Sequence, residues 1–331
     1  MNFMMNEKVK LQMNAWGAVR KPFVFLVDFE AKHMKIYAWE ECQSNGLQWR
    51  TPKHRNFIPN PQEKPFSWHS QPVSYQQYEA AFKLAHGHIL RGDSFLLNLT
   101  MPTILHTSLS LDDIAHRCTS PYLVHLRDEF VCFSPEIFVR INPQGVIRSN
   151  PMKGTIDAAI PHAETVLKNN VKEMAEHHTI VDLIRNDLSM VATEVHVSRF
   201  AYIDEIKSNH KHLLQMSSEV CGQLPNDWHC RLGDVFEKLL PAGSITGAPK
   251  VKTVEIIKEA EGYERGWYTG VFGVYDGQSV DSCVLIRFME QSETGLTYKS
   301  GGGITHLSTA TEEYDELINK VYVPFVGNHK I

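Results

Sequence analysis

The sequence predicts an α+β protein whose strands pair in hairpins and form layers against helices. Apolar runs of strand length are separated by turn residues, which favours hairpin connections. Segments of helical spacing interrupt these runs without the regular strand–helix–strand alternation of a parallel sheet. The chain has 331 residues, which is enough to bury a sizeable core in one large domain or two modest ones.

The N-terminal part of the chain contains the first predicted strands. The apolar run at residues 22–30, PFVFLVDFE, has strand length, and residues 34–41 are expected to form its neighbour. Residues 51–72 are rich in Pro and Asn and are expected to form a loop or linker. Residues 74–93 have helical spacing. One side of this expected helix carries the apolar residues Tyr78, Phe82, Ala85 and Ile89.

The remainder of the chain mixes hairpins with longer helices. Strands are expected at residues 94–105, 122–134, 137–149, 270–277 and 282–291, with a turn at residues 142–145. Helices are expected at residues 163–188, 248–261 and 311–321. Thr309 and Glu312 fit a capping box, which indicates that the last helix starts near them.

The composition excludes several classes of protein. The net charge is −5 and no long block has one sign, which argues against a dedicated nucleic-acid surface. The six cysteines form no C-x-x-C pair, so zinc ribbons and thioredoxin-like motifs are not expected. No apolar stretch approaches the roughly 20 residues of a membrane span, and the N-terminus has no signal-peptide core. We therefore expect a reduced, cytoplasmic protein without a membrane partner.

Carboxylates recur on two of the predicted helices. Glu173 and Glu176 are three positions apart and share one face of the helix at residues 163–188. Glu313, Glu316 and Lys320 share one face of the last helix. The two faces are either solvated, or they meet across a cleft and hold a hard divalent cation. Mg²⁺ suits the second interpretation, because it takes one or two carboxylates and keeps waters for a substrate oxygen.

Two glycine-containing stretches are candidate ligand loops. Gly301–Gly303 precede the last helix, and they form either a tight turn or a place where backbone N–H groups approach an anion. The stretch at residues 240–250, LPAGSITGAPK, lacks the spacing of a phosphate-binding P-loop. It is expected to lead into a helix at Pro249, and the Thr246 hydroxyl is a possible donor to a ligand.

Arg287 stands among apolar residues in the expected strand at residues 282–291. Its guanidinium is expected either to pair internally or to bind a ligand carboxylate. His177 and His178 lie beside Glu176, but no H-E-x-x-H motif is present, so both are interpreted as structural.

Lys153 lies in NPMKGT, directly after an expected strand. A lysine in a turn is ordinarily solvated. This stretch, however, is one of a series that occurs in the order of a known family: FLLNLT, FSPEIF, NPMKGT, AEHHTIVDLIRNDL, LPAGSITGAPKVKTVEII, GVFGVYDG, SCVLIRF, GGGITHLST and EEYDELINKV. Together these stretches resemble the chorismate-utilising enzymes, and most closely component I of aminodeoxychorismate synthase.

The resemblance covers about residues 74–321 and implies the chorismate-binding fold, with layered sheets flanked by helices around a central cleft. It implies a catalytic core at residues 73–331 and an abbreviated N-terminal region at residues 1–72 that packs on it. The resemblance assigns Lys153 as the nucleophile that attacks C2 of chorismate, and Glu136 as the acid for the leaving C4 hydroxyl. The lysine must be neutral to attack, which burial or neighbouring positive charge favours.

The remaining site residues are also assigned by the resemblance. Glu176 and Glu316 match Mg²⁺ ligands, and Glu173 and Glu313 are expected to support these ligands or to contact the metal through water. Substrate carboxylates are expected to contact Arg287, Lys320 and the backbone of Gly301–Gly303. Ammonia, free or delivered by a separate glutamine amidotransferase subunit, would then give 4-amino-4-deoxychorismate, a precursor of para-aminobenzoate and folate.

The sequence departs from the family pattern in three places. Gln215 aligns with a histidine in a family H-L-V-S stretch, Met152 replaces the commoner isoleucine, and the Leu-Leu-Glu-Ser signature of tryptophan-inhibited anthranilate synthases is absent.

Anthranilate synthases usually carry alanine at the position of Lys153. An anthranilate or isochorismate synthase, and a non-catalytic chorismate-binding regulatory subunit, are the alternatives.

Overall fold

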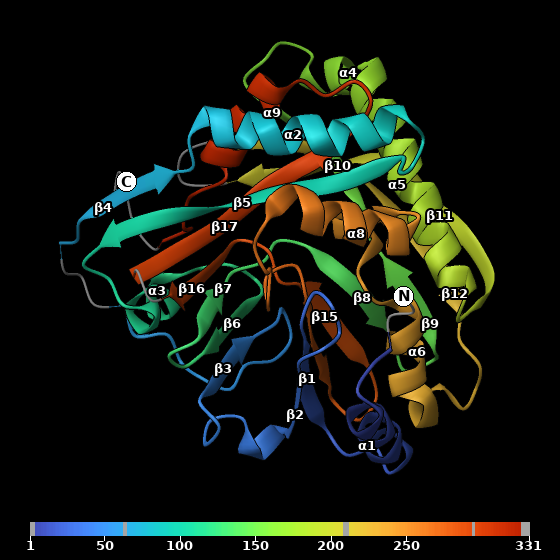
Figure 1. Cartoon of the computed structure of the whole chain (residues 1–331). Helices are drawn as coiled ribbons and strands as arrows, with labels where there is room; N and C mark the ends of the chain where they lie inside the picture. Colours follow the sequence, from blue (N-terminus) through green and yellow to red (C-terminus); the bar gives the residue numbers. More distant parts are fainter. Residues whose placement is uncertain (1–3, 62–64, 208–211, 293–294, 326–331) are drawn as a thin grey trace.

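A computed structural model of the chain describes residues 4–61, 65–207, 212–292 and 295–325. Two antiparallel sheets pack face to face, and helices cover the outer face of each sheet (Figure 1). This arrangement confirms the predicted α+β class.

The first sheet contains, in spatial order, β10 (Met152–Asp157), β12 (His212–Gln223), β9 (Val146–Ser149), β8 (Ile137–Ile141), β15 (Val280–Val284), β14 (Val271–Tyr275), β1 (Phe23–Val27) and β2 (Met34–Ala38), with β11 (Thr193–Lys207) paired to β12. The second sheet contains β13 (Gly247–Ala248), β5 (Leu96–Thr107), β17 (Gly295–Ile304), β16 (Phe288–Ser292), β7 (Phe130–Cys132), β6 (Leu123–Leu126) and β3 (Leu47–Arg50), with β4 (Trp68–Pro72) paired to β5.

The helices are α1 (Glu7–Ala18), α2 (Tyr75–Leu90), α3 (Leu111–Arg117), α4 (Ala163–Lys168), α5 (Val171–Ser189), α6 (Leu232–Leu239), α7 (Gly243–Thr246), α8 (Lys250–Glu261) and α9 (Ala310–Asn319), with short 3₁₀ helices at Trp39–Glu41 and Trp228–Arg231. An apolar cluster that includes Leu26, Trp49, Phe130 and Phe272 fills the space between the sheets. Helices α1, α5 and α6 cover the first sheet, whereas α2, α8 and α9 cover the second.

Strand β1 and helix α2 confirm two of the predictions. Every residue of β1 is buried, because one face packs under α6 and the other faces the second sheet. A continuous apolar run is what a strand covered on both faces requires. In α2, the predicted apolar side is buried against β5 and α8, and Ser74 caps the first turn. Strands β1 and β2 join the first sheet and β3 joins the second, so residues 1–72 contribute to both sheets.

The single helix predicted at residues 163–188 is wrong, because the structure has two helices there. Helix α4 ends at Lys168 and α5 begins at Val171. The Asn170 side chain accepts a hydrogen bond from the Glu173 backbone N–H, 3.1 Å away, and so caps a new helix. Asparagine favours this capping position over a helix interior, which explains the break.

The single strand predicted at residues 282–291 is also wrong, because the structure has two strands there, β15 and β16. The chain leaves the first sheet after Val284 and enters the second sheet at Phe288, so Arg287 lies at the crossing and not within a strand. Arg287 has φ +55°, a left-handed conformation that is uncommon for a residue with a side chain. The crossing brings this guanidinium to the junction of the two sheets.

Several further segments differ from the predictions. Gly301–Gly303 form part of β17 and pair with β5 instead of forming a turn (Figure 1). The end of the predicted loop at residues 51–72 forms β4. The long hairpin of β11 and β12, like α1 and α3, was not predicted, although alternating apolar residues such as Val195 and Val197 were a signal for β11. Within the described residues, no helix combines the length and apolar character that crossing a membrane requires.

Candidate active site

The predicted site residues meet where the ends of the two sheets approach α5 and α9. Lys153 lies on β10, Glu136 directly before β8, and the crossing residue Arg287 between β15 and β16. Glu173 and Glu176 come from α5, whereas Glu313 and Glu316 come from α9 and Lys320 follows it. The Gly301–Gly303 segment of β17 lies between these groups.

The amine of Lys153 lies directly over the glycine segment. A Cβ atom on Gly303 would be only 2.6 Å from Lys153 Nζ, so a residue with a side chain at this position would have to displace the lysine. Lys153 Nζ is also 3.9 Å from Glu176 Oε2. The lysine side chain is 22% exposed, so it is largely enclosed and not solvated as a turn lysine would be.

Carboxylates from α9 approach the neighbouring glycine. A Cβ atom on Gly302 would be 2.9 Å from Glu313 Oε2 and 3.1 Å from Glu316 Oε1. Glu313 Oε1 accepts a hydrogen bond from Ser308 at 2.7 Å, whereas its Oε2 is buried without a hydrogen-bond partner. An unsatisfied buried carboxylate oxygen is costly, and it is a position that a cation would satisfy.

The carboxylates influence each other electrostatically. Burial, followed by the charges of Glu316 and Glu176, raises the pKa of Glu313 to about 7. Burial and the same kind of like-charge repulsion, from Glu176 and Glu316, also raise the pKa of Glu173. Burial opposes ionisation of Glu316 as well, but the charge and hydrogen bond of Lys320, together with the charges of Lys153 and Lys172, outweigh it and lower the pKa. The α5 and α9 carboxylates therefore form one electrostatic cluster.

The four carboxylates do not form a closed metal site in this conformation. Among the residues that the structure describes, no group of three or more His, Cys, Asp and Glu side chains is arranged to hold a metal ion. Glu316 instead forms an ion pair with Lys320, and Glu176 lies beside Lys153. Lysine side-chain nitrogens thus stand close to the oxygens that a divalent cation would contact.

Glu136 is half-buried near the same cations and is held by a hydroxyl. Ser244, on α7, donates a hydrogen bond of 2.5 Å to Glu136 Oε1. Burial raises the pKa of Glu136, and this effect exceeds the opposing effects of the Ser244 hydrogen bond and of the charges on Lys153, Lys320 and Arg287. A carboxyl group whose pKa is raised in this way retains its proton at higher pH than an ordinary glutamate.

Two cationic groups, Lys320 and Arg287, are close enough to Glu136 to lower its pKa. Lys320 Nζ donates to the Gly301 carbonyl at 2.8 Å. The Arg287 guanidinium lies over the Tyr322 ring, 5.3 Å from its centroid, and its Nε has no hydrogen-bond partner. A guanidinium with an unused donor and an adjacent ammonium are suited to bind carboxylates.

A family model described as chorismate binding enzyme matches residues 17–325. The chain belongs to the chorismate binding enzyme family. An uncharacterized PabA-like protein of Haemophilus influenzae is 46% identical over 316 residues, with 96% of each chain covered. Anthranilate synthase component 1 of Saccharomyces cerevisiae is 30% identical over 292 residues, which cover 82% of this chain and 55% of that protein. Aminodeoxychorismate synthase component 1 of Bacillus subtilis is 29% identical over 266 residues, which cover 76% and 55%.

Solved structures agree with the predicted chorismate-binding fold. Anthranilate synthase component I from Streptococcus pneumoniae superposes with a TM-score of 0.65 at 26% identity, over 79% of this chain and 60% of that chain. The menaquinone-specific isochorismate synthase from Escherichia coli superposes with a TM-score of 0.71 at 15% identity, over 97% of this chain and 82% of that chain. The fold is thus shared by chorismate binding enzymes whose named reactions differ.

In this chorismate binding enzyme, the hydroxyl that reaches the site belongs to Ser244 and not to Thr246. The Thr246 side chain is fully buried and donates to the Ala242 carbonyl at 3.0 Å. Sequence reasoning missed Ser244, although both hydroxyl residues lie in the same glycine-containing stretch. Gln215, which aligns with the family histidine, lies on β12 opposite Thr155 of β10, two residues from Lys153.

Proposed function

We propose that this protein aminates chorismate at C4 and produces 4-amino-4-deoxychorismate. The observation that carries the proposal is the position of Lys153, whose amine lies over Gly303 and beside Glu176 and is close enough to Glu136 to influence the pKa of that carboxyl group. By the family resemblance, enzymes that add nitrogen at C2 usually have alanine at this position. The similarity to an aminodeoxychorismate synthase component 1 also supports the proposal.

The proposed reaction consists of two displacements. The neutral Lys153 amine attacks C2 of chorismate, the ring double bonds shift, and the C4–oxygen bond breaks. Glu136 donates a proton to the departing hydroxyl, which leaves as water. Ammonia then attacks C4, the double bonds shift back, and the C2–Nζ bond breaks to release the lysine. The advantage of covalent catalysis is that one difficult substitution becomes two easier ones.

The cationic groups and the glycine backbone are proposed to orient the substrate. Chorismate has two carboxylates, and the site offers the Arg287 guanidinium and the Lys320 ammonium as separate cations. The Gly301–Gly303 segment allows the substrate to approach the backbone of β17 closely, because no side chain stands between them. Fixing both carboxylates would hold C2 near Lys153 and the C4 hydroxyl near Glu136.

We propose that Glu176 and Glu316, supported by Glu173 and Glu313, hold Mg²⁺. Two properties of Glu313 fit a cation site: its Oε2 has no hydrogen-bond partner, and burial, followed by the charges of Glu316 and Glu176, raises its pKa. Hard oxygen ligands are those that Mg²⁺ prefers. When bound, Mg²⁺ would neutralise these carboxylates and hold the ring carboxylate of chorismate. The glutamates must first exchange their lysine partners for the cation.

Removal of Mg²⁺ is expected to abolish turnover, and its addition is expected to raise the melting temperature. A ligand at 100 times its dissociation constant stabilises the folded state by about 2.7 kcal/mol, which corresponds to a shift of a few degrees. Differential scanning fluorimetry with and without EDTA measures this without any reaction. Glu316→Gln should lose the response, whereas Glu312→Gln, on the exposed side of α9, should retain it. Turnover that persists in excess EDTA would exclude the metal role.

The isolated chain is expected to use ammonia and not glutamine. Glutamine hydrolysis of the expected type needs a cysteine nucleophile on a strained turn with a histidine beside it. Cys221 has a histidine neighbour, since its Sγ lies 3.4 Å from His196 Nε2, but it is buried within strand β12. Ammonia-dependent and glutamine-dependent rates should be compared on the purified chain. Equal rates would contradict this prediction, and glutamine use only after addition of a separate amidotransferase would support it.

Identification of the product tests the proposed function directly. The protein would be incubated with chorismate, Mg²⁺ and ammonium chloride, and the products separated by liquid chromatography with mass detection. Chromatography is essential because isochorismate and chorismate are isomers. 4-Amino-4-deoxychorismate supports the proposal, whereas anthranilate or isochorismate would assign the chain to the reactions named for its other relatives. Unchanged chorismate that nevertheless binds would indicate a non-catalytic binding subunit.

A further inference from the structure

Two charged residues in the matched stretches have no role in the site described above. Asp187 lies near the end of α5, in the stretch DLIRNDL, and Lys250 is the first residue of α8, in GAPK. Lys250 Nζ is 2.8 Å from Asp187 Oδ2, and it also donates to the Leu239 carbonyl at 2.8 Å. Both side chains are nearly covered, with exposed fractions of 15% for Lys250 and 6% for Asp187.

This ion pair joins three elements around the short helix α7. Asp187 belongs to α5, Leu239 ends α6, and Lys250 begins α8. The backbone of α7 packs directly on the pair, because a Cβ atom on Gly243 would be only 2.7 Å from Asp187 Oδ2. The next residue after Gly243 is Ser244, whose hydroxyl donates to Glu136.

The energetics of buried ion pairs argue that this pair does more than stabilise the fold. Burial raises the pKa of Asp187 and lowers the pKa of Lys250, so removal from water acts against the charged form of each partner. Coulombic attraction between two such groups commonly offsets only the cost of desolvation, and apolar residues of similar size often serve stability equally well. Buried ionic groups fix a unique geometry in some proteins, and the element that packs on this pair is α7.

We propose that the Asp187–Lys250 pair positions Glu136: it holds α7 so that Ser244 meets the Glu136 carboxyl group. The inference rests on the proposed function, because it assumes that Glu136 is the acid. A displacement of about 1 Å in a catalytic group can reduce a rate by about a hundredfold. Asp187 and Lys250 are positioning residues that act through Ser244, and neither is proposed to touch the substrate.

The proposal predicts a specific change in the pH profile. Ser244 stabilises the ionised form of Glu136 by its hydrogen bond, as do the charges of Lys153, Lys320 and Arg287 that face the same carboxyl group. Loss of the hydrogen bond should therefore raise the pKa of Glu136, and the decline of kcat on the alkaline side should move to higher pH. A purely structural role would reduce kcat without moving this limb.

The test compares the double variant Asp187→Asn/Lys250→Met with Ser244→Ala. The double variant should lower kcat by about tenfold to a hundredfold, with little change in KM. In both variants the alkaline decline of kcat should move to higher pH. Adding Ser244→Ala to the double variant should cause no further loss, because the hydrogen bond is already broken. Profiles must be recorded at a constant concentration of free ammonia, since its protonation also depends on pH.

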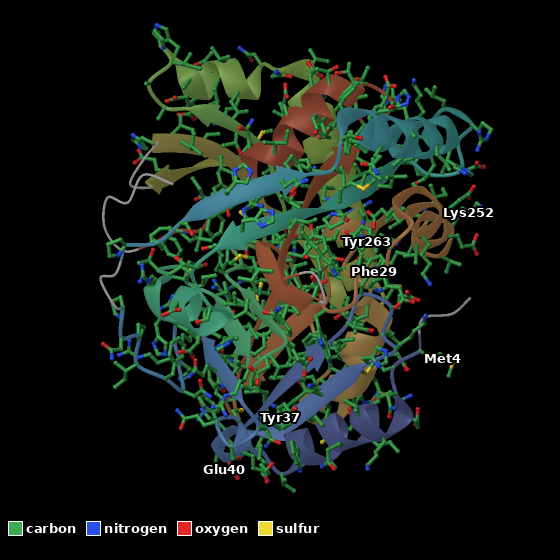
Figure 2. The ribbon with its side chains drawn as sticks, turned by 60° about the vertical axis from the view of Figure 1, so that its left-hand side comes forward. Met4, Phe29, Tyr37, Glu40, Lys252 and Tyr263 are labelled. Carbon is green, nitrogen blue, oxygen red and sulfur yellow. The ribbon has the colours of Figure 1, made fainter. Side chains whose placement is uncertain are left out.

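Controls separate the possible outcomes. Lys252→Met is the matched control, since Lys252 points outward from α8 (Figure 2) and pairs with the exposed Glu255. If the double variant does not fold, Gly243→Ala decides, because it displaces α7 and retains both charges. If the double variant has the wild-type kcat and the wild-type alkaline limb of the pH profile while Glu136→Gln is impaired, the positioning role is wrong and the acid role of Glu136 stands. If Glu136→Gln also behaves as wild type, the acid role proposed above fails with it.

Discussion

Replacement of Lys153 by arginine is expected to reduce formation of 4-amino-4-deoxychorismate by about a thousandfold or more. Arginine retains the positive charge, but it is not deprotonated near neutral pH and so cannot attack C2. Its larger planar group would also crowd Gly303, since even a Cβ atom on that glycine would lie 2.6 Å from the lysine amine. Because crowding by itself would slow the reaction, the covalent adduct of the wild-type protein described below, and not the loss of rate alone, distinguishes a nucleophilic role from charge complementarity.

The rate is best measured at saturating ammonia with chromatographic detection of the product. Lys168→Arg is the matched control, because Lys168 lies on α4 and pairs with the exposed Glu164. When ammonia is omitted, the wild-type protein should also accumulate a covalent adduct. The mass of the protein should then increase by the mass of chorismate less one water. Lys153→Arg should show no such increase. Product formation by Lys153→Arg at the wild-type rate would eliminate Lys153 as the nucleophile.

The elements that sequence reasoning predicted are those in which a local pattern and tertiary packing agree. Strand β1 is a continuous apolar run because it is covered on both faces, and α2 presents one apolar side to β5. The carboxylates of α5 and α9 could be grouped in advance because residues three positions apart share a helix face. The spacing of residues along the chain shows which side chains share a face, whatever elements pack next to it.

The features that could not be predicted depend on contacts between distant segments. The left-handed Arg287 between β15 and β16 exists because the chain crosses from one sheet to the other, and nothing in CVLIRFME indicates that crossing. The choice of Ser244 over Thr246 depends on the rotation of α7, since two positions along a helix turn by about 200°. One hydroxyl therefore reaches Glu136 while the other is buried.

The meeting of Lys153 with β17 is the clearest example of what a single sequence leaves open. Lys153 and Gly303 are far apart in the chain, and they meet because β10 and β17 belong to two sheets that pack against each other. The resemblance to a known family indicated that both belong to one site. Physical reasoning from the residues alone left Gly301–Gly303 equally compatible with a tight turn, which the pairing with β5 excludes.

The substitution Glu136→Gln is expected to lower kcat by about a hundredfold to ten-thousandfold, the usual contribution of a general acid. Glutamine has nearly the same shape, and its side-chain oxygen can still accept the Ser244 hydrogen bond, so the packing around α7 should be preserved. The variant lacks only the proton that the departing hydroxyl requires.

The pH dependence distinguishes this role from a structural one. Because burial raises the pKa of Glu136, the wild-type acid remains protonated above the range of an ordinary glutamate, and kcat should fall as the pH rises through that raised pKa. Glutamine does not titrate, so this alkaline limb should disappear in Glu136→Gln, while Glu129→Gln, whose carboxylate pairs with Lys35 outside the site, should retain it. If Glu136→Gln kept the alkaline limb together with a rate close to that of the wild type, the proton would have to come from another group, and Glu136 would not be the general acid.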